Sequence, residues 1–377
     1  MASKPTATSE YRSGAASPTR AVSDAPAACP SPPGYWRLVW QGRGQAFSVL
    51  LERRAVAVNL GLLLALLIAG VVYLSLGSVP LSVSEVIPAL AGQGDMMTTF
   101  MVQELRLPRL AAACLTGAAF ALAGVLMQTL AGNRLATPGI IGIDNGATAF
   151  AIASVIGVGV TIAPPAMALA GAATAAAITF GLSAGSGTQG YRFIVAGIGV
   201  GAVFGALTQF YLARVPIDTA NAAYPWTIGT LNARSPGAVL LLAAGLGVGV
   251  MLAMGLARSL SILRFKDAVA SGLGVKVKAC RIQVLALSVV LTGLAVAVAG
   301  PVGMVALIGP EIARSLSSSR HVPVLAATLA GALVMVLADL AGRTLLSPIE
   351  IPVGIVTAVV GGPWLLWILM RPQRSRP

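Results

Sequence analysis

The clearest structural signal in the chain is "LAAACLTGAAFALAGVLMQTLA", residues 110–131, which contains no charged side chain. About 20 apolar residues span the hydrocarbon core of a bilayer as a helix. The whole chain of 377 residues is 56% hydrophobic and 10% charged, with a mean hydropathy of +0.86, whereas soluble domains carry about 25% charged residues. The composition therefore predicts an all-α integral membrane protein.

We predict about ten membrane-spanning helices from the apolar stretches. Gly and Ala are frequent in them, which is typical of spans that pack closely through small residues. Pro164 and Pro165 alone separate the third and fourth spans, and Pro310 and Glu311 interrupt the short eighth span. The predicted spans are 55–76, 110–131, 141–163, 164–184, 193–213, 236–257, 282–299, 301–318, 322–342 and 353–370.

The positions of the cations predict the orientation. With the N-terminus in the cytoplasm, 20 of the 25 Lys and Arg residues fall on the inner side, as the positive-inside rule requires. Both chain ends are then cytoplasmic. The five cations left outside are Arg106, Arg109, Arg214, Arg234 and Arg343.

The composition also divides the chain. Residues 1–54 are predicted to be a largely disordered cytoplasmic tail, because residues 1–34 are rich in Ala, Ser, Pro and Thr and lack an apolar stretch. Without such a stretch we expect no cleaved signal peptide. Residues 55–371 form the transmembrane domain, and residues 372–377 are a second cytoplasmic tail.

Several classes of function are excluded by what the sequence lacks. It has no G-x-x-x-x-G-K-[ST] phosphate loop, so the chain is not predicted to hydrolyse ATP itself. Its one histidine is His321, and Cys29, Cys114 and Cys280 are scattered, so neither a metal site nor a disulfide framework is implied. We expect neither an enzyme, nor a cofactor in this chain, nor a nucleic-acid partner.

An ion-coupled carrier is the alternative from another class. Such carriers need carboxylates deep in the membrane. Asp144, Glu311 and Asp339 are the candidates, but all three lie near predicted span ends, where nearby N–H groups or Arg can satisfy them. The carrier is therefore the less favoured hypothesis.

Four stretches together resemble one family. They are "RLPRLAAACLTGAAFALAGVLMQTLAGNRLATPGIIGIDNGA" (106–147), "WTIGTLNARS" (226–235), "SLSILRFKDAVASGLGVKVKACR" (259–281), and "AGPVGMVALIGPEIARSL" (299–316) followed by residues 338–369. This set is similar to the permease subunits of type II ABC importers for iron–siderophore complexes and vitamin B12. The resemblance runs from about residue 55 to residue 371. It implies ten helices per subunit, two permease subunits, two cytoplasmic ATPase subunits that bind ATP and Mg, and a soluble binding protein outside.

The resemblance assigns a role to residues 259–281, named here the coupling segment. In this family the connection between the sixth and seventh spans forms two short helices that sit in a groove of the ATPase. Asp267, Ala268, Gly272 and Gly274 in "DAVASGLG" match the family's pattern. The alternative is that the cations of this segment only hold the loop inside by the positive-inside rule.

On the outer face, the resemblance implies docking of the binding protein at Arg106, Arg109 and Arg343. Arginine suits this role because its planar guanidinium can bind a carboxylate through two hydrogen bonds. The alternative is local pairing, of Arg106 with Glu104, or of Arg343 with Asp339 or Glu350.

The expected gating elements are the segment around 214–231 outside and the turn at 186–192 inside. Asn133, Gly190, Tyr191 and Arg234 are the candidate translocation or gating residues. The turn departs from the B12 permease, which has hydroxyl side chains where Gly190 and Tyr191 stand here. Arg134, Thr137 and Glu311 also depart from the commoner family pattern.

"LNARS" (231–235) is closer to the "LNGRS" of ferric siderophore permeases than to the Gly-rich stretch of the B12 permease. We therefore expect an iron(III)–siderophore, moved as the intact chelate across the cytoplasmic membrane. Vitamin B12 or haem are the alternatives within the family. A related second permease subunit is favoured over a second copy of this chain.

Overall fold

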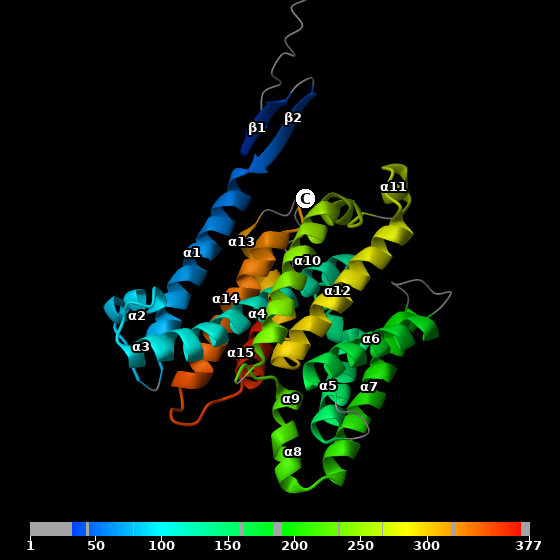
Figure 1. The fold of residues 1–377 in the computed structure, drawn as a ribbon. Helices are drawn as coiled ribbons and strands as arrows, with labels where there is room; N and C mark the ends of the chain where they lie inside the picture. Colours follow the sequence, from blue (N-terminus) through cyan, green and yellow to red (C-terminus); the bar gives the residue numbers. More distant parts are fainter. Residues whose placement is uncertain are drawn as a thin grey trace, which may run out of the picture. The chain divides into compact units, whose positions relative to one another are not determined.

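The computed structural model describes residues 32–42, 45–77, 79–157, 162–183, 191–232, 234–265, 267–317 and 321–370. The chain divides into two compact units, Met1–Leu51 and Glu52–Pro377. Strands β1 (Tyr35–Gly42) and β2 (Gln45–Glu52) pair as a two-stranded sheet (Figure 1). The prediction of a largely disordered tail did not foresee these strands, whose aromatic and β-branched residues favour extended backbone.

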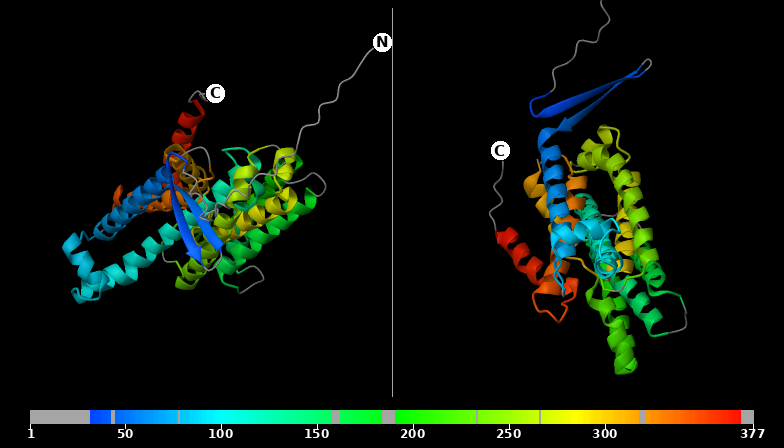
Figure 2. Two further views of the ribbon diagram at one scale, coloured as in Figure 1. Left: turned by 90° about the horizontal axis from the view of Figure 1, so that it is seen from above. Right: turned by 60° about the vertical axis from the view of Figure 1, so that its left-hand side comes forward.

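The second unit is helical, as predicted. Its long helices are separated by short helices and turns (Figures 1 and 2). The elements are α1 (Arg53–Ser75), α2 (Val83–Leu90), α3 (Met96–Phe100), the π-helix η1 (Met101–Arg106), α4 (Leu107–Ala131), the 3-10 helix η2 (Pro138–Ile141), α5 (Ile143–Val155), α6 (Pro164–Leu182), α7 (Tyr191–Arg214), α8 (Ile217–Ala223), α9 (Pro225–Ile228), α10 (Pro236–Ile262), α11 (Asp267–Gly272), α12 (Val277–Ala299), α13 (Val305–Leu316), α14 (Val324–Thr344) and α15 (Val353–Met370).

Each of the ten predicted spans contains one of these helices. Seven helices in the described part of the chain are long and apolar enough to cross a membrane. The other three are α5 with 13 residues, α13 with 12 residues and α15, whose apolar part is Val353–Trp367. The third and eighth spans are shorter than predicted, because α5 ends at Val155, before the predicted end at residue 163, and the turn at 300–304 precedes α13.

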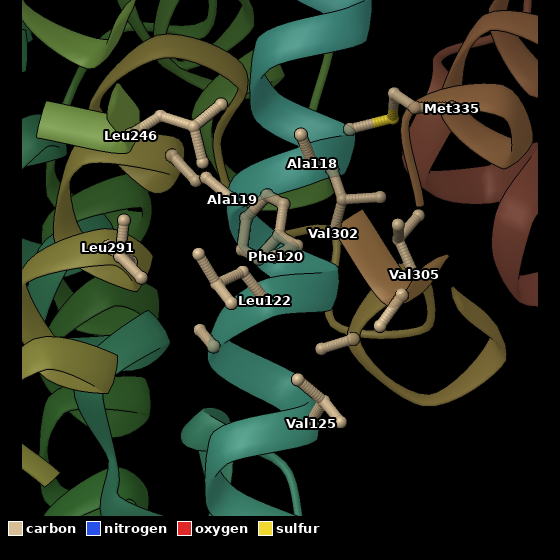
Figure 3. Close-up of a cluster of buried hydrophobic side chains, with 14 of the residues drawn as sticks. Ala118, Ala119, Phe120, Leu122, Val125, Leu246, Leu291, Val302, Val305 and Met335 are labelled. Carbon is tan, nitrogen blue, oxygen red and sulfur yellow. The ribbon is translucent and has the colours of Figure 1, made fainter. Parts of the chain in front are cut away.

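The helix α4, which contains the uncharged stretch 110–131, lies at the centre of the helical unit. It packs against α14, α13, α12 and α10, and nearly every residue from Ala112 to Leu130 has little exposed surface. In Figure 3, Leu246 and Leu291 lie on one side of α4 while Val305 and Met335 lie on the other. An apolar helix without a polar face is therefore buried by protein on all sides.

Small residues set the distance between α4 and α14. A side chain at Gly117 would collide with the backbone of Gly331, and one at Gly331 would collide with Gly117 and Ala121. Two glycines thus allow the two backbones to touch, which is the usual way in which membrane helices approach closely. This contact fixes the register of the two helices.

Candidate functional site

The register of α4 and α14 brings an arginine and an aspartate together. The two helices run in opposite directions, and Arg109 precedes Gly117 by as many residues as Asp339 follows Gly331. Both residues therefore lie about two helical turns from the glycine contact, toward the end that the cation bias places outside. The tyrosine Tyr73 reaches the same point from the end of α1, which packs along α14.

These residues form an outer clamp, defined here as Tyr73, Arg109, Asp339 and Arg343. Arg109 binds Asp339 through two bonds, Nε to Oδ2 and Nη2 to Oδ1, each 3.0 Å long. The Tyr73 hydroxyl donates to Asp339 Oδ2 at 2.6 Å. The Asp339 side chain is only 2% exposed, so its charge is removed from water and depends on these partners.

Arg343 completes the clamp. Its Nε lies 3.8 Å from Asp339 Oδ2, and its guanidinium stacks over the Tyr73 ring at 4.1 Å. Its Nη2 also donates to the carbonyl oxygen of Tyr73 at 3.3 Å. The clamp thus ties α1, α4 and α14 together by ion pairs, hydrogen bonds and a cation–π contact.

Arg109 has a second carboxylate partner outside the clamp. Its Nη1 lies 2.9 Å from Glu350 Oε2, and Glu350 belongs to the segment between α14 and α15. The Glu350 side chain is 47% exposed, in contrast to that of Asp339. One guanidinium therefore holds a buried and an exposed carboxylate at the same time.

Arg106 is held in a different way. Its residue is only 6% exposed, and it donates to the carbonyl oxygens of Leu74, Ser75 and Val79. These bonds fix the turn after α1, but no carboxylate in the described part of the chain forms an ion pair with Arg106. The expected pairing with Glu104 is replaced by bonds to the backbone.

Arg234, a candidate gating residue, lies close to these arginines. Its Nε and Nη2 donate to the Thr230 carbonyl oxygen at 3.0 and 2.8 Å, and its guanidinium stacks over Trp226 at 4.7 Å. Burial lowers the pKa of Arg234 to about 10, so the side chain stays protonated at neutral pH.

An outer hollow of about 720 Å³ joins the four arginines Arg106, Arg109, Arg234 and Arg343. Glu104, Asn232 and Glu350 line it as well, together with apolar side chains of α4 and α10. Docking and gating were predicted for these arginines separately, and the structure brings them to one place.

The docking role of these arginines stays a prediction. The local pair expected between Arg343 and Asp339 is found, whereas Glu350 pairs with Arg109.

The coupling segment lies at the other end of α10 and α12. The expected pair of short helices is a single helix, α11, because α10 and α12 extend further than the predicted spans and take up the rest of the segment. Asp267 at the start of α11 pairs with Arg281 at 2.7 Å. Gly274 has the positive φ of +82° expected at a turn, and Gly272 ends α11.

The surface of the coupling segment is apolar as well as basic. Phe265, Val269 and Leu273 are all exposed, Leu273 to 61%. Ala270 alone in α11 is buried, against the rest of the helical unit. The matched residue Ala268 is exposed next to them. Sequence reasoning stressed the cations and missed this apolar surface, although the apolar residues could have been noticed within a cytoplasmic loop.

Two of the remaining candidate residues, Asn133 and Tyr191, lie at or near helix ends in the described part of the chain. The Asn133 side chain accepts a hydrogen bond from the Leu135 N–H at 2.9 Å in the turn after α4. Gly190 falls outside the described residues, and Tyr191 is the first residue of α7. Asn133 does not line the outer hollow that Arg234 lines, and the gating role of all four residues stays a prediction.

The three acids considered for an ion-coupled carrier differ from one another. Asp339 belongs to the outer clamp, and Glu311 pairs with Arg314 at 3.1 Å and with Arg134 at 3.6 Å. Asp144 has a buried Oδ1 that lacks a hydrogen-bond partner within the described part of the chain. Two of the three acids are therefore paired with Arg near span ends, which is the alternative that the sequence analysis favoured over an ion-coupled carrier.

A helical membrane unit with a central α4, a cytoplasmic α11 and an arginine-lined outer hollow defines a transport protein of the ABC permease type. Residues 63–371 match the model of the FecCD transport family, and the chain belongs to this family. The resemblance found in the sequence is thereby confirmed. The chain is a multi-pass protein of the cytoplasmic membrane, as expected.

Similar proteins and a similar solved structure support the family assignment. The achromobactin transport permease of Dickeya dadantii is 37% identical over 89% of this chain and 97% of its own length. The ferric enterobactin permease of Escherichia coli is 33% identical over 87% and 100%. The hemin permease of Yersinia pestis is 34% identical over 72% and 84%. An inward-facing structure of a metal-chelate type ABC transporter matches 84% of this chain and 100% of its own with a TM-score of 0.74 and 26% identity.

Proposed function

We propose that this chain is the permease subunit of an ATP-driven importer that moves iron(III)–siderophore complexes across the cytoplasmic membrane as intact chelates. The observation that carries the proposal is the family match over residues 63–371, with relatives named for achromobactin and ferric enterobactin. The "LNARS" stretch supports it, because Asn232 and Arg234 line the outer hollow.

The energy comes from two separate ATPase subunits that bind ATP and Mg, since the sequence has no phosphate loop. They dock on the coupling segment, where Phe265, Val269 and Leu273 offer exposed apolar contacts. Hollows of about 430 and 350 Å³ adjoin this segment, where it meets α10 and α12. This chain needs no cofactor of its own.

The movement reaches the membrane through α10 and α12, which continue from both ends of the coupling segment. Both helices pack against the buried helix α4. Because a close-packed core transmits displacement rather than absorbing it, a shift of α11 is passed to the centre of the helical unit.

The soluble binding protein docks at the outer hollow through acidic side chains. Four arginines line this hollow. Among the described residues, the carboxylates at or behind its wall are those of Glu104, Glu350 and Asp339, so a positive charge is left over. Such a field orients and accelerates docking more than it adds affinity. Arg106, Arg109 and Arg343 are the docking residues that we propose.

The complete transporter contains a second permease subunit, and a related but different chain is favoured over a second copy. Mass spectrometry of the purified complex distinguishes the two. Among other cargoes of the family, haem is the second candidate because the hemin permease of Yersinia pestis is 34% identical. Vitamin B12 is a further alternative.

The test is uptake into proteoliposomes that contain this chain with its permease partner and ATPases. Labelled ferric siderophore should enter only with ATP and the binding protein, and unlabelled siderophore should compete where hemin and vitamin B12 do not. Competition by hemin or B12 alone would reassign the cargo. Uptake by the permease without ATPase, driven by an ion gradient, would establish the carrier instead.

A further inference from the structure

Arg109 holds its two carboxylates by opposite edges and in opposite surroundings. Asp339, whose side chain is 2% exposed, accepts from Nε and Nη2 of Arg109. Glu350, whose side chain is 47% exposed, accepts from Nη1. The pair with Asp339 cannot exchange without opening the packed ends of α1, α4 and α14. The pair with Glu350 faces the outer hollow and can exchange with another carboxylate.

A carboxylate from a docking partner approaches Arg109 from the exposed side, where Glu350 is already bound to Nη1. The guanidinium offers its fork in a fixed plane, and Asp339 already occupies one side of that fork. The remaining edge carries Glu350, whose negative charge also repels a second carboxylate. An acidic partner that binds Arg109 through Nη1 therefore competes with Glu350, and the charge of Glu350 disfavours binding through the neighbouring N–H groups as long as Glu350 stays in place.

The segment that carries Glu350 is connected to the outer gating element. The Ile351 N–H donates to the Gly342 carbonyl oxygen at 2.9 Å, and the Gly354 N–H donates to the Gly229 carbonyl oxygen at 3.2 Å. A side chain at Gly354 would collide with the Ile228 carbonyl oxygen, so the two backbones touch. Ile228 ends α9 and lies in the segment around 214–231 that is expected to gate the outer side.

We propose that Glu350 is an internal substitute for the carboxylate of the binding protein. In the undocked permease, Glu350 occupies the exposed edge of Arg109 and ties residues 345–352 to α4. Docking of an acidic side chain displaces Glu350 and frees this segment at one end, next to the contact of Gly354 with α9. The inference rests on the proposed docking role of Arg109. It adds a route by which docking changes the contacts of the expected outer gating segment around 214–231.

The test is the variant Glu350→Gln, which keeps the shape of the side chain and removes its charge. The complex with its ATPases is placed in nanodiscs, and the probe is the fluorescently labelled soluble binding protein that supports uptake in the proteoliposome test. Because an exposed ion pair contributes little, removing the competitor should tighten binding by about two- to fivefold. Hydrogen exchange at residues 345–352 should rise in the undocked variant to the level of the docked wild type.

Glu104→Gln is the matched control, since Glu104 lines the same hollow and its substitution removes the same charge. Equal tightening by both variants would show a long-range charge effect and overturn the proposal. A binding protein whose acidic lobe residues are changed to amides checks docking separately. If that protein binds weakly while Glu350→Gln changes nothing, docking stands and the role of Glu350 is wrong. If it binds as tightly as its parent, docking through carboxylates fails as well.

Discussion

The outer clamp contains two cations and the coupling segment contains five, and the two regions use them differently. At the outer clamp, Arg109 and Arg343 are largely buried and bind Asp339 and Tyr73 of the same chain. At the coupling segment, Asp267 is exposed where it pairs with Arg281, and apolar side chains such as Leu273 face outward. The comparison shows that an arginine against the positive-inside bias can hold helices together, while a basic loop that follows the bias can present a contact surface.

The difference has a physical cause. Removing one partner of a buried ion pair leaves a charge in a medium that cannot solvate it, whereas an exposed ion pair is solvated and screened when it breaks. The outer clamp is therefore predicted to be rigid and essential for folding. The coupling segment is predicted to tolerate substitution in folding but not in transport.

The largest effect is expected for Asp339→Asn. This variant removes the carboxylate that Arg109, Arg343 and Tyr73 share, and it leaves two guanidinium groups poorly compensated. Breaking a buried pair in this way costs about 3–5 kcal/mol. Thermal unfolding in detergent, followed by size-exclusion chromatography, measures the loss.

Glu350→Gln is the control for that comparison, since it removes the exposed partner of the same Arg109. Its loss of stability should be within about 1 kcal/mol. Equal losses for the two variants would mean that the clamp draws no special stability from burial.

A loss of function without a loss of stability is expected for Leu273→Asp. The side chain is 61% exposed, so the folded chain should change by no more than about 0.5 kcal/mol. The charge would disrupt an apolar contact with the ATPase, and we expect ATP-driven uptake to fall by about tenfold. Uptake in proteoliposomes and co-purification of the ATPase measure the effect.

Met96→Asp is the matched control for that variant, because Met96 is an exposed apolar residue at the start of α3, far along the chain from the coupling segment. Uptake by this control should stay near that of the parent. Wild-type uptake by Leu273→Asp would show that the ATPase does not use this surface.

The smallest effect concerns an exposed charge on the outer side. The Glu85 carboxylate accepts bonds from the hydroxyl and the N–H of Ser82, both 2.8 Å long, and these bonds lower the pKa of Glu85. A carboxyl with a lowered folded pKa stabilises the fold above its ordinary pKa of about 4.3, and this stabilisation is lost as the pH falls through the lower value. The protection of the α2 amides, measured as their exchange relative to the intrinsic rate at each pH, should therefore fall on acidification below about pH 4, and Glu85→Gln should lack this step. A step of equal size in the variant would assign it to another group.

The sequence predicted the helical part of the fold well. Each apolar stretch became a helix, because a long run without charges has no favourable environment in water. It predicted the span ends less well: α12 begins at Val277, five residues before the predicted start, since Lys278 and Arg281 continue the helix beyond the bilayer. It also missed the strands at 35–52, because the disorder predicted from the composition of residues 1–34 was extended to residue 54.

The candidate site was predicted only in part. The sequence singled out Arg106, Arg109, Arg234 and Arg343 because they break the positive-inside bias. It could not show that Tyr73 shares Asp339 with Arg109, since the three residues are far apart in the chain and are joined only by the packing of α1, α4 and α14. Nor could it show that Glu350 pairs with Arg109 rather than with Arg343.

The amino-acid sequence by itself determined the membrane location, the number and approximate positions of the helices, their orientation and the family. These follow from local hydrophobicity, charge bias and short motifs. The tertiary structure alone decided which charges are buried and which are exchangeable. That outcome depends on the register set by Gly117 and Gly331, because a helix that slides or rotates by one residue places its side chains against different neighbours.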